Sequence, residues 1–233
     1  MQNNALLFMY YVKNNYPTVT LNAISAIIGN IEKESTINSG RHEGDNTSTT
    51  SKGLGFIQWT PYPAGSTNPL VTAWNNSSYR WHTYTVRNDM YDPEWQIDLI
   101  MAELGNNSPS VSGYWINRSG GYNGLSGSWY PYLSKSAFLT STKSAYDLGL
   151  VYHGCREGSA DGTTKLKARG DCCQKWYDFL LPYWNGTTKT KEVSETTTGE
   201  EIPLESDDTD KTETTGKNKI LKCYMKRNTY KFK

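Results

Sequence analysis

Residues 29–61 read GNIEKESTINSGRHEGDNTSTTSKGLGFIQWTP, and the predicted fold and function depend most on this stretch. It starts near the end of an apolar helix pattern, crosses a polar segment and reaches the block GLGFIQWT. Ile27, Ile31 and Glu34 are spaced i, i+4, i+7, so they share one face of the predicted helix. Glu32 lies well around the helix, on a more polar side. Glu34 therefore continues the apolar face at the helix end.

This position predicts that Glu34 keeps its proton near neutral pH. Partial burial disfavours the charged carboxylate, and the negative end of the helix dipole disfavours it again. A protonated carboxyl group is what a general acid in glycosidic cleavage requires. On position alone, a solvated glutamate at a helix end is the simpler interpretation.

The remaining patterns predict an α+β domain that is mainly helical. The first helix is marked by apolar residues at helical spacing, namely Ala5, Phe8, Met9 and Val12. The second follows Thr20 as N-cap and carries the stripe Leu21, Ile24, Ile28 and Ile31. A third helix has Asp92 as N-cap, Pro93 at its first position and Gly105 as its stop. Two more helical patterns cover roughly residues 142–155 and 167–181, and the polar stretch 40–60 predicts a small β-hairpin.

Composition divides the chain near Gly186 and predicts a folded domain over residues 1–186. Residues 187–216 are rich in Thr and Glu and contain no aromatic residue, which indicates a disordered linker. Residues 217–233 are basic, with alternation that fits one strand. This basic C-terminal segment is open to three interpretations: the start of a further domain, a contact with a partner, or a solvated tail.

Charge and hydropathy give no sign of a nucleic-acid partner or of a membrane span. The net charge is +1, which gives no sign of a nucleic-acid partner, and no apolar run approaches the roughly 20 residues of a membrane span. The N-terminal residues MQNNALLFMYYVKNN do not resemble a signal peptide, so we expect synthesis in a cytosol and exit, if any, by another route. The cysteines, Cys155, Cys172, Cys173 and Cys223, are expected to be buried thiols. A disulfide from Cys155 to Cys172 or Cys173 is the alternative.

The motifs ESTIN, from Glu34 to Asn38, and GLGFIQ, from Gly53 to Gln58, together resemble the lysozyme superfamily. In that superfamily a catalytic Glu-Ser-x-apolar-Asn at a helix end precedes a β-element that ends in Gly-apolar-apolar-Gln. The longer forms AIIGNIEKESTIN and GLGFIQWTP look closest to phage tail lysozymes, the peptidoglycan-cutting domains carried by tail or injection machinery. The resemblance is strongest over residues 20–61, extends weakly to about Trp184 and does not cover the tail of the chain.

The resemblance implies that Glu34 is the general acid that protonates the leaving glycosidic oxygen, and that Gln58 lies across the cleft near the substrate. Trp59 is either a wall for a sugar or an anchor of the hairpin to the core. In the hen-type branch an aspartate precedes the glycine block, but here that position is Gly53. The nearest acids are Glu43 and Asp45 in the connecting loop, where solvated loop charges are the alternative interpretation.

Three mechanisms remain open from the sequence. Asp45 or Glu43 could hold a water as general base, with carboxyl groups about 6.5–9.5 Å apart, or could act as nucleophile from about 5 Å. Glu34 could instead serve as both acid and base, as in lytic transglycosylases, which release an anhydro sugar. The resemblance to phage tail lysozymes favours hydrolysis.

A glycine-rich aromatic region offers further sugar contacts. Trp115, Tyr122 and Trp129 lie among glycines and asparagines, a composition suited to stacking on sugars and bonding their hydroxyl groups. A tyrosine-rich loop folded over its own core is the alternative.

Rival enzyme classes have weaker support. The three histidines are scattered and no zinc motif is present, so we expect no metal and no other cofactor. A cysteine peptidase needs a Cys and a distant His, but His153 and Cys155 are only two residues apart. A non-catalytic wall-binding or tail-structural module that keeps a lysozyme-like shape is the main rival.

The predicted function is that of a virion-associated muramidase on a phage tail. It is expected to cut the β-1,4 bond between N-acetylmuramic acid and N-acetylglucosamine in bacterial peptidoglycan. Of the three interpretations of residues 217–233, a contact with a partner would be with other phage tail proteins. A lysin that stays in the host cytoplasm until holin-mediated release fits the same sequence.

Overall fold

The computed structural model describes residues 1–43, 52–62, 65–84, 87–158 and 161–187 of the 233-residue chain. Asp45, Cys223, the basic segment 217–233 and all but the first residue of the predicted linker lie outside these described residues. The helices follow in the order α1 (Gln2–Asn15), α2 (Leu21–Ser35), α3 (Pro69–Asn75), η2 (Ser77–Tyr79), α4 (Pro93–Glu103), η3 (Gly127–Trp129), α5 (Lys135–Leu139), α6 (Ala145–Tyr152), η4 (His153–Glu157) and α7 (Thr163–Trp184). The fold is therefore mainly helical, as the sequence predicts.

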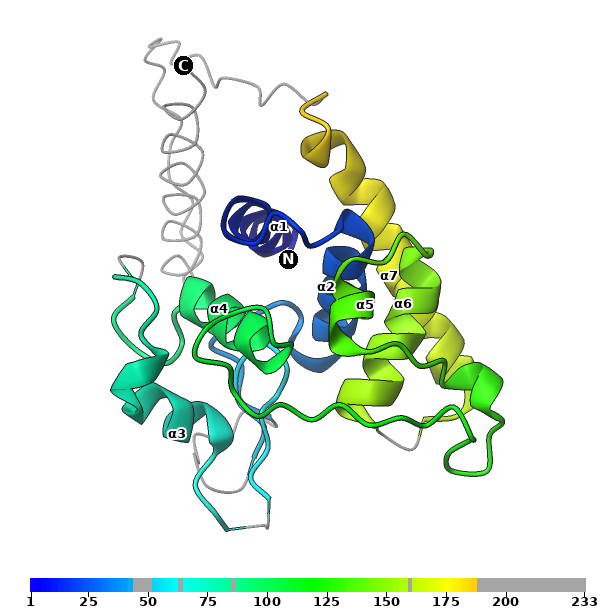
Figure 1. The fold of residues 1–233 in the computed structure, drawn as a ribbon, viewed down its shortest axis with the longest axis horizontal. Helices are drawn as coiled ribbons and strands as arrows, with labels where there is room; N and C mark the ends of the chain where they lie inside the picture. Colours follow the sequence, from blue (N-terminus) through cyan, green and yellow to red (C-terminus); the bar gives the residue numbers. More distant parts are fainter. Residues whose placement is uncertain (44–51, 63–64, 85–86, 159–160, 188–233) are drawn as a thin grey trace, which may run out of the picture.

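Helices α2, α6 and α7 pack most extensively against one another, and Figure 1 shows them side by side. Glycines allow this close approach: an added Cβ at Gly29 of α2 or at Gly149 of α6 would lie 2.5 Å from Sγ of Cys173 on α7. Three residues of the predicted stripe of α2, Ile24, Ile28 and Ile31, are fully buried. Three helices thus meet around one cysteine, with almost no space between their backbones.

Helices α1 and α4 pack together on the other side of α2. Ala5, Phe8, Met9 and Val12 are fully buried, which confirms the predicted face of α1. Buried Asp98 of α4 accepts hydrogen bonds from the hydroxyl groups of Tyr11, at 2.8 Å, and Tyr16, at 2.7 Å. The two helices are therefore joined by a satisfied polar contact as well as by apolar packing.

Local sequence signals set several helix ends as predicted. Thr20 accepts a hydrogen bond from the Ala23 amide at 3.2 Å, and Asp92 accepts one from the Trp95 amide at 3.0 Å. Gly105 follows α4 with φ of 76°, the left-handed conformation that glycine adopts at little cost. The side chains of Thr20 and Asp92 satisfy backbone N–H groups that the first helical turns leave unpaired.

Other boundaries differ from the prediction. The pattern over 142–155 is divided into α6, capped by Ser144, and a π-helical turn, η4, that begins at His153. Helix α7 starts at Thr163, four residues before the predicted start, because its polar first turn lacks the apolar period on which the prediction relied. The short helices α3 and α5 contain too few residues to show a clear helical period in the sequence.

The predicted β-hairpin over residues 40–60 is not present as strands in the part of this segment that the structure describes. Two isolated antiparallel bridges, His42 with Leu54 and Leu54 with Trp59, take its place. The second bridge closes a tight reversal in which Gly55 has φ of 74° and Gln58 has φ of 51°. A turn this short leaves no room for a ladder of paired residues.

No helix in the described ranges is long and apolar enough to cross a membrane. Cys155, Cys172 and Cys173 are buried free thiols, which confirms the prediction for these three cysteines. The minority alternative, a disulfide from Cys155, is not formed.

Candidate active site

Glu34 lies in the last turn of α2, where the motif ESTIN ends the helix. Ser35 is buried; its hydroxyl donates to the Ile31 carbonyl at 3.2 Å and accepts from the Asn38 amide at 3.4 Å. Thr36 and Ile37 both have φ of 57°, in the left-handed region that β-branched residues rarely adopt. Ile37 is fully buried, so core packing holds this unfavourable backbone in place beside Glu34.

Arg169 of α7 is the main partner of Glu34. Its Nη2 donates to Oε1 of Glu34 at 2.8 Å, and its Nη1 donates to Oε2 of Glu157 at 2.7 Å. Its Nε donates to Oδ2 of Asp161 at 3.1 Å. A single guanidinium group therefore binds three carboxyl groups, with every one of its nitrogens engaged.

The Glu34 side chain is 26% exposed, so the carboxyl group reaches the surface while most of it is enclosed. Burial raises the pKa of Glu34 above its ordinary value, and the charge of Glu157 raises it further, whereas Arg169 lowers it. The net direction is upward, which confirms the predicted shift in the Glu34 pKa. The second cause is a neighbouring carboxylate, in addition to the burial that the sequence suggested.

The block GLGFIQWT forms the tight reversal described above and is fixed from inside by Gln96 of α4. Gln96 is fully buried; its Oε1 accepts from the Phe56 amide at 2.9 Å, and its Nε2 donates to the Ser39 carbonyl at 2.9 Å. A Cβ at Gly55 would lie 2.7 Å from Oε1 of Gln96, so this position requires glycine for its φ and for space.

Gln58 and Gly53 lie against each other across this reversal. A Cβ at Gly53 would lie 2.9 Å from Cβ of Gln58, so an aspartate would not fit there unless Gln58 moved. The side-chain Nε2 of Gln58 donates to the Gly55 carbonyl at 2.8 Å and to the Arg41 carbonyl at 3.3 Å. The departure from the hen-type pattern therefore has a steric counterpart, and Gln58 is held in a defined orientation.

Glu43 is exposed and is bonded to the backbone of Gly53. Its Oε2 accepts from the Gly53 amide at 2.9 Å, and its own amide donates to the Gly53 carbonyl at 3.0 Å. Its carboxylate thus lies at the glycine that replaces the hen-type aspartate. Asp45, the other predicted partner of Glu34, falls outside the described residues, so its role stays a prediction.

Trp59 is placed as the anchor that the sequence offered as an alternative to a sugar wall. The side chain is 4% exposed, and its Nε1 donates to Oε1 of Glu103 at 2.9 Å. The other oxygen of Glu103 accepts from Nη2 of Arg156 at 2.8 Å. Trp59 therefore joins the reversal to α4 and η4 through a buried carboxylate, and little of its ring is left for a ligand.

The aromatic segment between α4 and α5 divides into packed and exposed residues. Trp115 is half-buried: its ring contacts Phe138 at 5.4 Å between centroids, and its Nε1 donates to the Leu133 carbonyl at 2.9 Å. Trp129 is partly buried and packs against a small second cluster of buried residues, Tyr130, Leu150 and Leu166. Tyr122 is 36% exposed, with Arg118 over its ring at 4.6 Å. Of the three, Tyr122 is the most available for a sugar.

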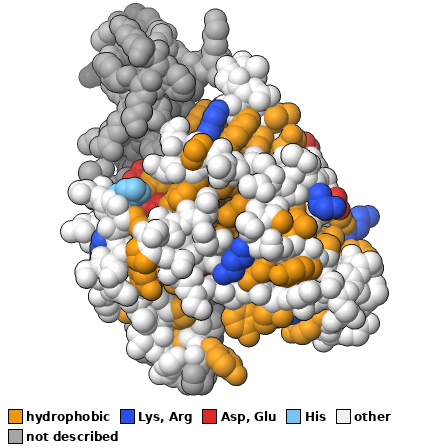
Figure 2. All heavy atoms as spheres, in the orientation of Figure 1, with side chains coloured by type: hydrophobic (Ala, Val, Ile, Leu, Met, Phe, Trp, Pro, Cys, Tyr) orange, Lys and Arg blue, Asp and Glu red, His pale blue; other side chains and the backbone are white. Residues whose placement is uncertain are grey.

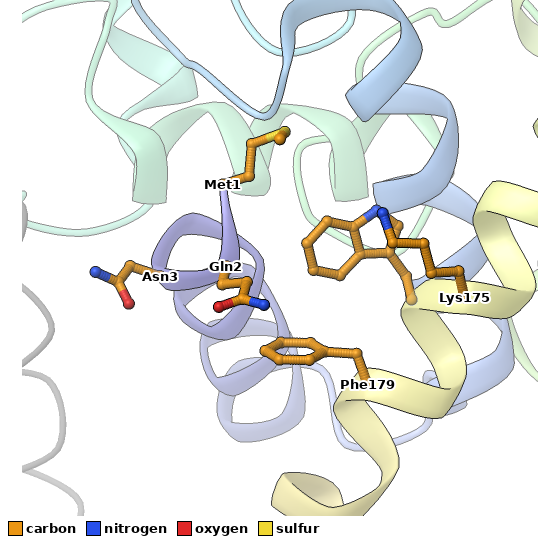
Figure 3. Close-up of a pocket in the computed structure, with 6 residues that line it drawn as sticks. Met1, Gln2, Asn3, Lys175 and Phe179 are labelled. Carbon is orange, nitrogen blue, oxygen red and sulfur yellow. The ribbon is translucent and has the colours of Figure 1, made fainter.

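A cavity beside α1 is lined by none of the described candidates for catalysis, Glu34 and Glu43. Figure 3 shows a cavity of about 470 Å³ between the start of α1 and α7, lined by Met1, Gln2, Asn3, Lys175, Trp176 and Phe179. On the face drawn in Figure 2, Lys and Arg side chains are scattered and do not form a patch. Within the described ranges, no group of three or more His, Cys, Asp or Glu side chains is placed to hold a metal ion.

The sequence did not identify Arg169, Glu157 and Asp161. A signal for Arg169 was present, since it follows Leu166 and precedes Cys173 at i, i+3, i+7 on the buried face of α7. A charged residue on an apolar stripe requires a partner. Glu157 and Asp161 gave no comparable signal, because their neighbours along the chain are polar.

Two comparisons with known proteins found similarity. A family model described as phage tail lysozyme matches residues 3–180. Morphogenesis protein 1 of Bacillus phage B103 is 29% identical over 161 residues, which are 69% of this chain and 35% of that protein. The chain thus spans about a third of the length of this curated relative. The family match covers α1 to most of α7, and so includes Glu34, the reversal and Arg169.

Proposed function

The chain belongs to the phage tail lysozyme family, and from that premise we propose that it is a glycosidase of bacterial peptidoglycan with Glu34 as general acid. The family implies a peptidoglycan-hydrolase role, and the proposal adds the bond and the residue. The bond is the β-1,4 linkage between N-acetylmuramic acid and N-acetylglucosamine. The observation that carries the proposal is the carboxyl group of Glu34, which is mostly enclosed, has a raised pKa and reaches the surface at the end of α2.

In the proposed reaction the Glu34 proton passes to the glycosidic oxygen as the carbon–oxygen bond breaks. Gln58, held by two backbone carbonyls, and exposed Tyr122 are the proposed substrate contacts. Glu43 is the described candidate for the second carboxylate, because it lies at Gly53 and is exposed to solvent. Asp45 is proposed as its alternative, and Trp115 and Trp129 as supporting walls of the same aromatic segment.

We also propose where the protein acts. The family and the phage morphogenesis relative support a virion-associated protein that acts on the host cell wall. Residues 1–186 are proposed as the catalytic domain, residues 187–216 as a linker, and residues 217–233 as a contact with other tail proteins. Purified phage particles probed with an antibody against residues 1–186 test this location; absence of the protein from intact particles contradicts it.

The test of the reaction uses the purified full chain on peptidoglycan, with measurement of new reducing ends and mass spectrometry of the soluble sugars. We expect Glu34→Gln to lose about 10²- to 10⁴-fold in rate, the usual effect of removing a general acid. The matched control is Glu32→Gln on the same helix, because Gln still accepts the bond that Trp176 donates to Glu32 at 2.6 Å. We expect this control to keep its activity.

Four outcomes separate the alternatives. Reducing ends on muramic acid support hydrolysis, whereas anhydro-muramic products assign the chain to lytic transglycosylases with Glu34 as acid and base. A wild-type protein that binds walls but releases no sugar termini is a non-catalytic module. If Glu34→Gln clears walls as fast as the wild type, Glu34 is not the acid.

A further inference from the structure

The cluster of charged groups behind Glu34 is larger than an ion pair. Arg169 is 11% exposed and binds Glu34, Glu157 and Asp161 through its three nitrogens. His153 is fully buried between two of these acids, with Nδ1 at 2.9 Å from Glu157 and Nε2 at 3.7 Å from Asp161. These groups come from α2, η4, the segment before α7, and α7 itself.

The charges of the cluster do not balance when every carboxyl group is ionised. Three acids then face Arg169 and His153, so they outnumber these cations even when His153 is protonated, and Lys165, 3.4 Å from Asp161, has a side chain that is 76% exposed to water. Buried Arg156 also interacts with Glu157 by charge, but it is paired with Glu103 at 2.8 Å. Tyr152 of α6 and Cys173 of α7 also face this site, and burial raises the pKa of both, so they stay neutral. A partly enclosed cluster with excess negative charge is relieved when one of its acids takes up a proton.

Two observations indicate which acid holds that proton. Glu34 is bonded to Arg169, whereas Glu157 is bonded to both Arg169 and His153, and Asp161 lies 3.1–3.7 Å from Arg169, Lys165 and His153, so the negative charge of Glu34 has the weakest support. Oε1 of Glu157 is buried without a hydrogen-bond partner among the described residues. Arg169 bonds one oxygen of Glu34 and one of Glu157, so it brings the two carboxyl groups together, and a protonated Glu34 supplies the donor that two carboxylates lack.

We propose that Glu157 is a positioning residue whose negative charge keeps the proton on Glu34. Arg169 holds the two carboxyl groups together, and its positive charge offsets part of the repulsion between them. This inference rests on the proposed role of Glu34 as general acid. Before reaction, Glu34 shares its proton with Glu157. When the glycosidic bond breaks, the O–H bond of Glu34 breaks, the leaving sugar oxygen gains the proton and the bonding electron pair, and Glu34 becomes a carboxylate. Arg169, already bonded to Glu34, then stabilises the new charge.

Glu157 acts through Glu34 and does not itself touch the substrate. Its side chain is 10% exposed, and its Oε2 is bonded to both Arg169 and His153. A second catalytic carboxylate needs access to a water molecule or to the sugar ring. Such access is available to Glu43 on the surface but not to Glu157.

The test is the alkaline limb of the pH–rate profile of the full chain on peptidoglycan. A general acid is active when protonated, so rate is lost as pH rises through the pKa of Glu34. Glu157→Gln removes a repulsive charge and leaves Arg169, so we expect this limb to move to lower pH by about one unit. Arg169→Gln removes the attractive charge, so we expect a shift of similar size to higher pH. Arg169→Lys keeps the charge, and we expect a smaller shift than for Arg169→Gln.

A matched control separates charge from structure. Asp178→Asn removes a carboxylate from the exposed side of α7, where Oδ1 of Asp178 accepts a hydrogen bond from Nε2 of Gln174 at 3.0 Å. We expect its limb to coincide with that of the wild type. A merely structural role for Glu157 and Arg169 would lower the rate at every pH without moving the limbs in opposite directions.

The outcomes distinguish this inference from the proposed function. If Glu34→Gln keeps its activity, the general-acid proposal fails first. If Glu34→Gln is inactive but the Glu157→Gln limb stays in place or moves to higher pH, Glu157 does not hold the proton on Glu34. Should Arg169→Gln not fold, carbon NMR titration of the Glu34 carboxyl in wild type and Glu157→Gln decides the question without an activity readout. An unchanged Glu34 pKa there overturns the proposal.

Discussion

Replacing Gly149 by alanine tests the contact that sets the spacing of α6 and α7. The added Cβ would lie 2.5 Å from Sγ and 3.1 Å from Cβ of Cys173, both of them side-chain atoms. Overpacking of this kind costs about 1–3 kcal/mol, and the better helix propensity of alanine offsets about 1 kcal/mol. We therefore expect Gly149→Ala to reduce the free energy of unfolding by up to about 2 kcal/mol.

The cysteine offers a specific rescue. Cys173→Ala alone leaves a void the size of one sulfur atom, which costs about 1 kcal/mol. In the double variant Gly149→Ala, Cys173→Ala, the new methyl group fills that void and only the 3.1 Å approach remains, which needs a shift of a few tenths of an ångström. We expect the double variant to be at least as stable as either single variant, with a coupling energy of about 1–2 kcal/mol.

Gly29 provides the contrasting case on the other side of the same cysteine. An added Cβ there would lie 2.6 Å from Cα and 2.7 Å from the amide nitrogen of Cys173, which are backbone atoms. Removal of the sulfur cannot relieve those contacts. We expect Gly29→Ala to cost about 3 kcal/mol or more, with no rescue by Cys173→Ala, because α2 and α7 must separate.

Urea unfolding of the full chain, with the m-value compared between proteins, measures the stability of the wild type and of the five variants. Equal rescue of Gly29→Ala and Gly149→Ala by Cys173→Ala would refute the distinction between backbone and side-chain contact. Wild-type stability of Gly29→Ala would refute the close approach of α2 and α7 altogether. Because Glu34 and Arg169 lie on these two helices, the same separation is expected to weaken the pair that they form.

Two further predictions concern charge. The folded-state pKa of Glu34 is raised above 4.5, so its stabilising contribution is complete below the unfolded pKa and is lost as pH rises through the folded value. Glu34→Gln is neutral at every pH, so we expect it to gain stability over the wild type as pH rises from the unfolded to the folded pKa of Glu34. A constant difference in thermal midpoint across acid and neutral pH would contradict this. Glu103→Ala leaves the Arg156 charge and the Trp59 indole without their acceptor, so we expect a loss of about 3 kcal/mol in urea unfolding. Adding Arg156→Met should recover part of that loss, and no recovery would show that the unpaired charge is not its cause.

Helix caps and buried faces could be predicted because they depend on residues close together in the chain. Thr20 and Asp92 bond to amides three residues ahead, and the apolar residues of α1 recur every three or four positions. The place of Glu34 at a helix end belongs to the same class, since the apolar period of α2 and the ESTIN motif together locate it. The predicted β-hairpin is not shown in the described part of residues 40–60, where composition alone could not tell a strand from a tight reversal held by side chains such as Gln96.

The surroundings of Glu34 were decided by tertiary structure. Arg169 is 135 residues from Glu34 along the chain, and it reaches Glu34 only because glycines let α2 and α7 approach closely. The role of Trp59 was likewise fixed by Glu103, which is 44 residues away. The sequence by itself determined which carboxyl group lies at the end of α2, through local periodicity and capping. Only the packing of α2, η4 and α7 decided which charges surround that group, because electrostatic interactions depend on distance in space and not on separation along the chain.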